Sequence, residues 1–203
     1  MITVITMLTT NLALKAIPDQ QPSESQQSYL LLTKADIPAF LALQAKVIAA
    51  LPEDKKHYLK PRTAQDLEAH LDADMPIIAV KDHDGKIIAQ ELVTLFNSPA
   101  AKNLENYPNI GTDPKAAVQA VQVDPEARGK KLSEVLLNAA KTEAANLGAA
   151  SLLAKVASDN DSQKSFLNTG FTKAAAVWDK AGGYFANYFQ VALAKSEASL
   201  KPV

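Results

Sequence analysis

The feature that most limits the fold of this chain is a change of hydrophobic period in its second half. Residues 116–123 form a short apolar run that is typical of a buried strand. From Leu132 onward, apolar and small residues recur every three or four positions as far as Gly148, which predicts a helix capped by a glycine. Residues 151–156 are a second apolar run. A strand, a helix and a strand in this order predict a right-handed crossover between two parallel strands.

The rest of the chain predicts antiparallel pairs and further helices. Four strands are expected to form two hairpins, at residues 77–81 with 86–95 and at residues 171–178 with 184–193. One more strand and three more helices are expected at residues 29–33, 35–51, 65–71 and 162–169. The predicted fold class is therefore α+β: a mixed, mostly antiparallel twisted sheet with one parallel β-α-β crossover and helices on both faces.

The composition excludes several kinds of chemistry. The 203 residues, 47% of them hydrophobic, suffice for one domain with a substantial core. There is no cysteine, which excludes disulfides, a catalytic thiol and thiolate metal sites. A net charge of -1 gives no sign of a nucleic acid or an anionic membrane as partner. His57, His70 and His83 are too widely spaced for a helical metal site, so no metal is expected.

The ends of the chain differ from its middle. We expect an N-terminal extension and linker over residues 1–28, a single domain over 29–195 and a tail over 196–203. The first apolar stretch has no positive charge before its apolar part, and no run reaches 18 apolar residues. These features predict a cytoplasmic protein that does not associate with membranes.

A basic turn joins the strand at 116–123 to the long helix. Arg128, Lys130 and Lys131 precede a helix N-terminus, where the helix dipole disfavours cations. A bound pyrophosphate would relieve this conflict, and Gly129 would let it approach the backbone closely. In the alternative interpretation, Asp124 caps a helix that contains Gly129, and the lysines are solvated. The residues alone leave both interpretations open.

The segment resembles a known family. The pattern Val-x-Val-x-Pro-x-x-Arg-Gly-Lys follows a strand, Gly148 ends the next helix, and the pair Gly170-Phe171 follows the helix after that. These features are similar to the GNAT superfamily of acyl-CoA-dependent N-acyltransferases over residues 29–193. The chain departs from the usual phosphate loop of that family at Lys131 and Ser133, where glycine or another small residue is common.

The resemblance implies acetyl-CoA as co-substrate and assigns residues to its parts. Backbone groups of Val121 and Val123 would pair with the pantetheine arm as an added strand would, provided that the two parallel strands separate there. Asn160 and Ser162 correspond to a second block of the family, in which either Asn160 stands one residue out of step or Asp159 replaces the usual asparagine. The pyrophosphate would be held by the turn and helix start formed by Arg128, Gly129, Lys130, Lys131, Leu132 and Ser133.

The implied reaction is direct attack of a primary amine on the thioester, which calls for a base and an acid. The position at which some family members carry a catalytic tyrosine is Phe166 here. Tyr184 and Tyr188 lie four apart on a strand and are candidate acids, although such rings also serve as core residues. Glu91 is the candidate base, although strand glutamates often face solvent.

The expected acceptor is a small-molecule amine, and a homodimer is compatible with the sequence. Two other functions stay open: a catalytically silent acyl-CoA binding module, and a protein-interaction domain that uses the N-terminal extension. We expect the basic run that contains Arg62 to be a solvated face. Trp178, Phe185 and Phe189 are expected in the core.

Overall fold

The computed structural model describes residues 28–104, 107, 113–179 and 182–194, and its elements follow the predicted order. The expected extension and tail lie outside the described residues, as does part of the connection over 96–115, so the predicted domain limits stay predictions. The α-helices are α1 (Ile37–Ala49), α2 (Ala64–Asp72), α3 (Leu132–Asn146) and α4 (Gln163–Asn168). The strands are β1 (Leu30–Leu31), β2 (Ile77–Lys81), β3 (Ile87–Leu95), β4 (Lys115–Val123), β5 (Ser151–Ala157), β6 (Thr172–Asp179) and β7 (Tyr184–Ala192). Short 3-10 turns are η1 (Lys34–Asp36), η2 (Glu53–Tyr58), η3 (Pro99–Asn103) and η4 (Pro125–Ala127).

Local sequence signals account for the element ends. Thr63 and Asp66 form a capping box at the start of α2: the Thr63 hydroxyl accepts from the Asp66 amide at 3.1 Å, and the Asp66 carboxylate accepts from the Thr63 amide at 2.9 Å. In the β2–β3 turn, the Asp82 carboxylate accepts from the amides of Asp84 and Lys86, both at 3.0 Å. These contacts form within a few residues of chain, which is why the sequence predicts both elements.

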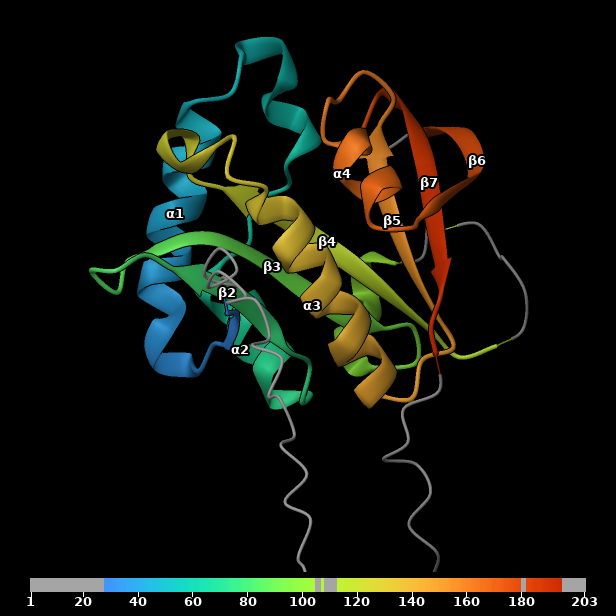
Figure 1. The fold of residues 1–203 in the computed structure, drawn as a ribbon, viewed down its shortest axis with the longest axis horizontal. Helices are drawn as coiled ribbons and strands as arrows, with labels where there is room; N and C mark the ends of the chain where they lie inside the picture. Colours follow the sequence, from blue (N-terminus) through green and yellow to red (C-terminus); the bar gives the residue numbers. More distant parts are fainter. Residues whose placement is uncertain (1–27, 105–106, 108–112, 180–181, 195–203) are drawn as a thin grey trace, which may run out of the picture.

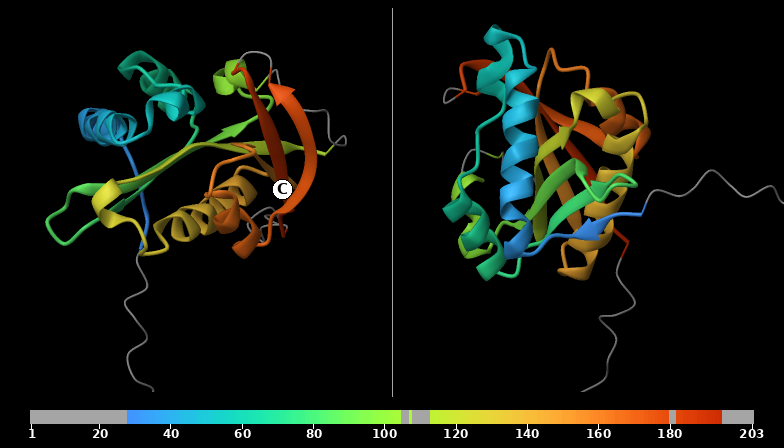
Figure 2. Two further views of the ribbon diagram at one scale, coloured as in Figure 1. Left: turned by 90° about the horizontal axis from the view of Figure 1, so that it is seen from above. Right: turned by 90° about the vertical axis from the view of Figure 1, so that its left-hand side faces the viewer.

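The sheet has the strand order β1-β2-β3-β4-β5-β7-β6 (Figure 1). Of its pairs, β4 with β5 is parallel and the others are antiparallel. The predicted α+β class is confirmed. Viewed from above, α1 and α2 lie on one face of the sheet and α3 and α4 on the other (Figure 2, left). Each pair of helices covers its own apolar core, around Phe40 and Leu67 on one face and Leu136 and Phe166 on the other.

The parallel strands separate half-way along their length. They pair from Lys115 opposite Ser151 to Val118 opposite Ala154 and no further. Beyond that point β4 stays with β3 and β5 stays with β7. At a bulge in β4, Ala120 has φ +51° and two residues of β4 face Glu91 of β3. The expected separation of the strands is present, and it leaves the β5-facing edge of β4 without a strand partner.

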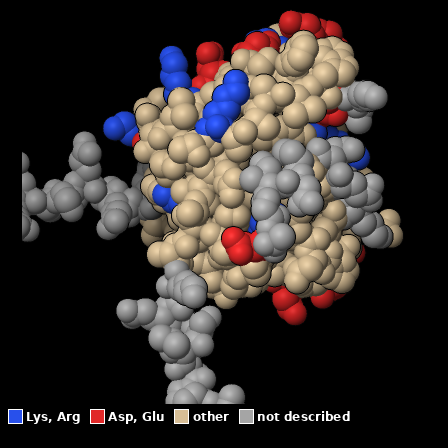
Figure 3. All heavy atoms as spheres, turned by 90° about the vertical axis from the view of Figure 1, so that its right-hand side faces the viewer, with Lys and Arg blue, Asp and Glu red and all other residues tan. Residues whose placement is uncertain are grey.

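Two of the three aromatic residues that the sequence predicts in the core are exposed instead. Phe189 is buried, but Trp178 on β6 and Phe185 on β7 are 48% and 59% exposed. Their rings pack on each other at 4.9 Å between centroids. The helices do not extend over this end of the sheet, and the described surface on that side consists mainly of uncharged residues (Figure 3). Strand alternation alone does not reveal where helical cover ends.

Candidate active site

The gap between the separating strands opens into a cleft of ≈ 860 Å³. One wall is the edge of β4 from Val118 to Val123, and the opposite wall is β5 from Ala154 to Ala157. The turn before α3, η2 and the residues that follow η2 also line the cleft. Lys55 of η2 forms an ion pair with Asp159 after β5 at 3.3 Å, which ties η2 to the far side of the cleft.

The turn before α3 presents unpaired backbone groups to this cleft. Gly129 has φ +81°, and a Cβ atom added there would meet nothing within 4 Å. Lys131 is the N-cap of α3 and adopts the left-handed conformation, with φ +56°, where glycine would be less strained. Among the described residues, the amides of Leu132 and Ser133 have no hydrogen-bond acceptor. An open turn with free amides at a helix N-terminus can receive an anion.

The alternative interpretation of this turn is correct in one detail only. Asp124 does act as a cap, because its carboxylate accepts from the Glu126 amide at 3.0 Å. The capped element, however, is the short turn η4, after which Arg128 returns to an extended conformation. Gly129 therefore lies in a loop and not inside a helix, and α3 begins at Leu132.

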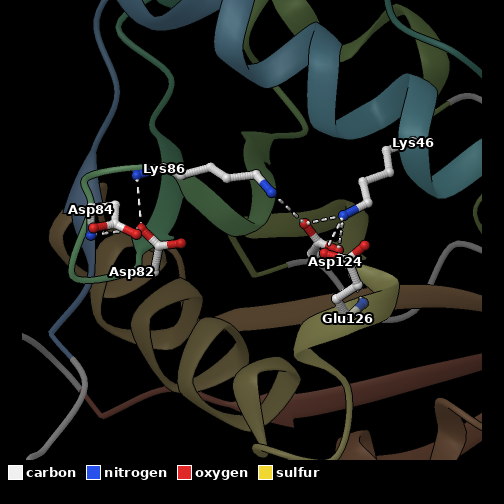
Figure 4. A network of polar contacts seen from close by, with 6 residues as sticks. All are labelled: Lys46, Asp82, Asp84, Lys86, Asp124 and Glu126. Atoms are coloured by element: carbon white, nitrogen blue, oxygen red, sulfur yellow. Dashed lines mark hydrogen bonds and ion pairs between the residues drawn. The ribbon is translucent and has the colours of Figure 1, made fainter.

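An ion-pair network around the buried Asp124 fixes the position of this turn (Figure 4). Asp124 is 1% exposed and lies 2.8 Å from the Lys46 ammonium of α1 and 3.3 Å from that of Lys86 on the β2–β3 hairpin. Lys46 also pairs with Glu126 at 2.9 Å. Burial alone would raise the pKa of the Asp124 carboxyl, but hydrogen bonds from Lys46, the Glu126 amide and Lys86 lower it below its usual value. Helix α1 and the β2–β3 hairpin are thereby anchored to the residue that follows β4.

Aromatic and cationic side chains also line this cleft. The Arg62 guanidinium donates to the Gln119 side chain on β4. The Tyr184 ring packs against Tyr58 at 4.8 Å between centroids. Burial, followed by the charge and hydrogen bond of Asp179, raises the pKa of Tyr184 to about 12. Tyr184 therefore keeps its proton at neutral pH and can donate it.

Comparison with known proteins identifies the family. The model of the acetyltransferase (GNAT) family matches residues 43–171, which is more than half of the chain. The chain belongs to the GNAT family. No curated protein matches the sequence significantly.

Solved structures share the GNAT fold with this chain. A putative phosphinothricin N-acetyltransferase is 23% identical, with a TM-score of 0.59 over 83% of this chain and 99% of that one. A putative acetyltransferase from Salmonella typhimurium with its cofactor acetyl-CoA is 19% identical, with a TM-score of 0.59 over 87% and 97%. A phosphinothricin acetyltransferase from Sinorhizobium meliloti in complex with AcCoA is 16% identical, with a TM-score of 0.62 over 87% and 92%.

Most of the residues that the GNAT resemblance assigns to the co-substrate line the cleft. Lys130 is exposed and is not among the lining residues. The Ser162 amide donates to the Asn160 side chain at 2.9 Å, which holds the loop before α4 in place. The lining residues of the predicted set are Val121, Val123, Arg128, Gly129, Lys131, Leu132, Ser133, Asn160 and Ser162.

The three predicted catalytic residues are separated by the GNAT fold. Tyr184 lines the cleft, whereas Tyr188 and Glu91 are not among its lining residues. Tyr188 is 2% exposed and its ring packs against that of Tyr107, with 5.3 Å between ring centroids. Glu91 is completely buried, and burial raises the pKa of its carboxyl well above the usual value. Strand alternation alone suggested that a glutamate on β3 faces solvent. It does not, because helices cover both faces of this strand.

Sequence reasoning missed two residues of this cleft. Arg62 is expected on a solvated face, but it is partly buried and lines the cleft. Tyr107 also lines the cleft; it comes from the connection over 96–115, whose length and prolines make it a candidate binding loop without naming any residue in it. One signal was available for Arg62, since it directly precedes the capping box of α2, where a loop residue is held rigidly. No pattern in the sequence marks Tyr107.

Two negative findings apply to the described residues of this GNAT chain. They contain no cluster of three or more metal-binding side chains. They also include no helix with the length and apolar character that crossing a bilayer requires.

Proposed function

We propose that this GNAT protein transfers the acetyl group of acetyl-CoA to a primary amine by direct attack within a ternary complex. The observation that carries the proposal is the continuity of one cleft. Its lining runs from the open turn at Gly129, along the unpaired edge of β4, to the point at which β4 and β5 part. Two of the solved structures with this fold contain acetyl-CoA.

In the proposed complex, the co-substrate runs along this cleft from the turn before α3 to the point at which the strands part. Its pyrophosphate would accept hydrogen bonds from the amides between Gly129 and Ser133, with Arg128 and Lys131 providing positive charge. Its pantetheine arm would bond to the free edge of β4 past Val123 and Val121, as an added strand does. The thioester then lies near Gln119, where the strands separate.

The chemistry requires no covalent bond to the protein. The neutral amine forms a bond to the thioester carbon, the carbon–sulfur bond then breaks, and CoA leaves as a thiolate. Tyr184 is the proposed acid that protonates this thiolate, since it lines the cleft and holds its proton. We assign no side chain as base, because Glu91 is buried away from the cleft. Water accepts the proton that the amine loses, and rate depends strongly on how the two substrates are oriented.

A glycine pair tests the proposed phosphate turn. In the Gly129→Val variant, the valine side chain would fill the space in which the pyrophosphate is proposed to bind. The Kd for acetyl-CoA should therefore rise at least about tenfold. Gly148→Val is the matched control, because Gly148 has φ +82° and equally open surroundings at the other end of α3. The two glycines have nearly the same φ, and only the Gly129→Val variant should lose affinity in calorimetric titration.

The outcomes of this titration separate the proposed functions. Equal affinity in the two glycine variants would show that the turn does not hold the pyrophosphate. Tight binding of acetyl-CoA without CoA release in the presence of any amine would favour the catalytically silent binding module. An absence of binding to the wild-type protein would overturn both functions.

A further inference from the structure

In the proposed active site, the side chain of Arg62 forms no ion pair with any carboxylate of the described residues. Its guanidinium donates to the neutral side chain of Gln119, and its Nε atom is buried without any hydrogen-bond partner. Burial lowers the pKa of this guanidinium, and the charge of Asp66 opposes this shift only in part.

The unpaired charge of Arg62 is not needed to hold the fold together. The link between α1 and the start of α2 uses the backbone of Arg62, whose amide donates to the Gln44 side chain at 2.8 Å and whose carbonyl accepts from it at 2.9 Å. A shorter or neutral side chain at this position would leave both bonds intact. Burying an unpaired cation lowers stability, so a ligand that supplies the missing anion accounts for the cost.

The position of Arg62 indicates which ligand supplies that anion. Gln119 directly follows Val118, the last residue of β4 that pairs with β5. Four residues, or roughly 13 Å of strand, separate it from Val123 and the proposed phosphate turn. The pyrophosphate of the co-substrate is therefore at the opposite end of the cleft. Lys55, another cation that lines the cleft, is already neutralised by Asp159.

From this arrangement we infer that the acceptor is a small amine that also carries a carboxylate, and that Arg62 binds this carboxylate. The inference rests on the proposed function, because it places the amine at the thioester. The guanidinium lies beside the residue at which the strands part, so the carboxylate and the reacting amine are only a few atoms apart. A free amino acid has this arrangement, whereas the N-terminus of a peptide does not. The planar guanidinium suits bidentate binding of a carboxylate.

The test compares amines that differ only in the carboxylate. CoA release is followed by a thiol reagent, to which a chain without cysteine contributes no background. The substrates are the twenty common amino acids and their carboxamides. We expect kcat/KM for the best amino acid to exceed that for its amide at least about tenfold. In the Arg62→Met variant this preference should disappear, while the Kd for acetyl-CoA stays the same and the melting temperature stays equal or rises.

Lys55→Met is the control, because it removes a cation from the same cleft that already has a partner; it should keep the preference for acids. The inference would be overturned if amino acids and their carboxamides reacted equally, or if only amines without a carboxylate reacted. It would also be overturned by an unchanged preference in Arg62→Met, or by acetyl-CoA binding with no reaction of any amino acid. A wild-type protein that does not bind acetyl-CoA would instead refute the proposed function, so the two failures are distinguishable.

Discussion

At the scale of single residues, backbone strain is concentrated at the cleft. Three described non-glycine residues have positive φ: Asp74, Ala120 and Lys131. The last two line the cleft, one at the bulge of β4 and the other at the phosphate turn. Left-handed conformations cost about 1–2 kcal/mol for such residues, and strain of this kind is commonly retained at functional sites. Both strained residues therefore lie where the co-substrate is proposed to bind.

The proposed acid can be tested by removing one oxygen atom. In Tyr184→Phe we expect kcat to fall about 100-fold, since a positioned general acid contributes on this order. The Kd for acetyl-CoA should not change. Because its pKa is raised to about 12, Tyr184 should cause no loss of activity as pH rises from 7 to 10.

Tyr188→Phe provides the comparison, because this ring is on the same strand but does not line the cleft. Its kcat should stay within about threefold of wild type. Steady-state assays of both variants at saturating acetyl-CoA decide the matter, and a Tyr184→Phe enzyme with wild-type kcat would rule out this residue as the acid.

At the scale of elements, α2 contains a buried histidine that makes stability depend on pH. His70 is 5% exposed, and its Nε2 lies 3.3 Å from the Pro76 carbonyl. Burial lowers the pKa of its imidazole to about 4, whereas the unfolded chain has the usual value of 6.5. Between these values the unfolded state binds a proton that the folded state does not. The stabilisation is therefore complete above pH 6.5 and is lost as pH falls to 4.

This histidine predicts a pH-dependent difference between variants. The wild-type protein should lose roughly 3 kcal/mol of unfolding free energy between pH 6.5 and 4 through His70 alone. His70→Leu should show a correspondingly flatter profile in urea unfolding at several pH values. His83→Leu is the control, since its side chain is 88% exposed. Parallel profiles for His70→Leu and wild type would contradict the assignment.

At the scale of the whole molecule, the first described residues are joined to the domain by contacts with α3 and β2. The Tyr29 hydroxyl donates to the Glu143 carboxylate of α3 at 2.8 Å, and Leu32 is 5% exposed. The strand between them pairs with β2. These contacts agree with a domain that begins near residue 29.

The predicted domain limits can be tested by deletion. A chain of residues 29–195 should keep its melting temperature within about 2 °C and its affinity for acetyl-CoA, because the removed parts lie outside the predicted domain. A chain that starts at residue 34 loses Tyr29 and Leu32 and should be less stable by about 2 kcal/mol or more. Calorimetric melting of the two deletions measures this. Equal loss of stability in both would place the domain boundary earlier in the chain.

The sequence by itself determined the order of elements, and it singled out the turn before α3 as a candidate phosphate site, which stays a prediction. Hydrophobic period, capping residues and glycines act over a few residues, so they can be recognised without tertiary structure. Gly129, in the turn before α3, and Gly148, just after its end, are examples. The separation of β4 from β5 could be anticipated only through the family resemblance.

Only the tertiary structure decided which side chains meet in the cleft. Arg62 reaches Gln119 across 57 positions of sequence, and Tyr107 comes from a connection without any periodic pattern. Glu91 alternates as a solvent-facing strand residue would, yet it is buried because α3 covers that face of the sheet. Burial and charge pairing depend on segments that are far apart in the chain, and local patterns carry no information about how such segments pack.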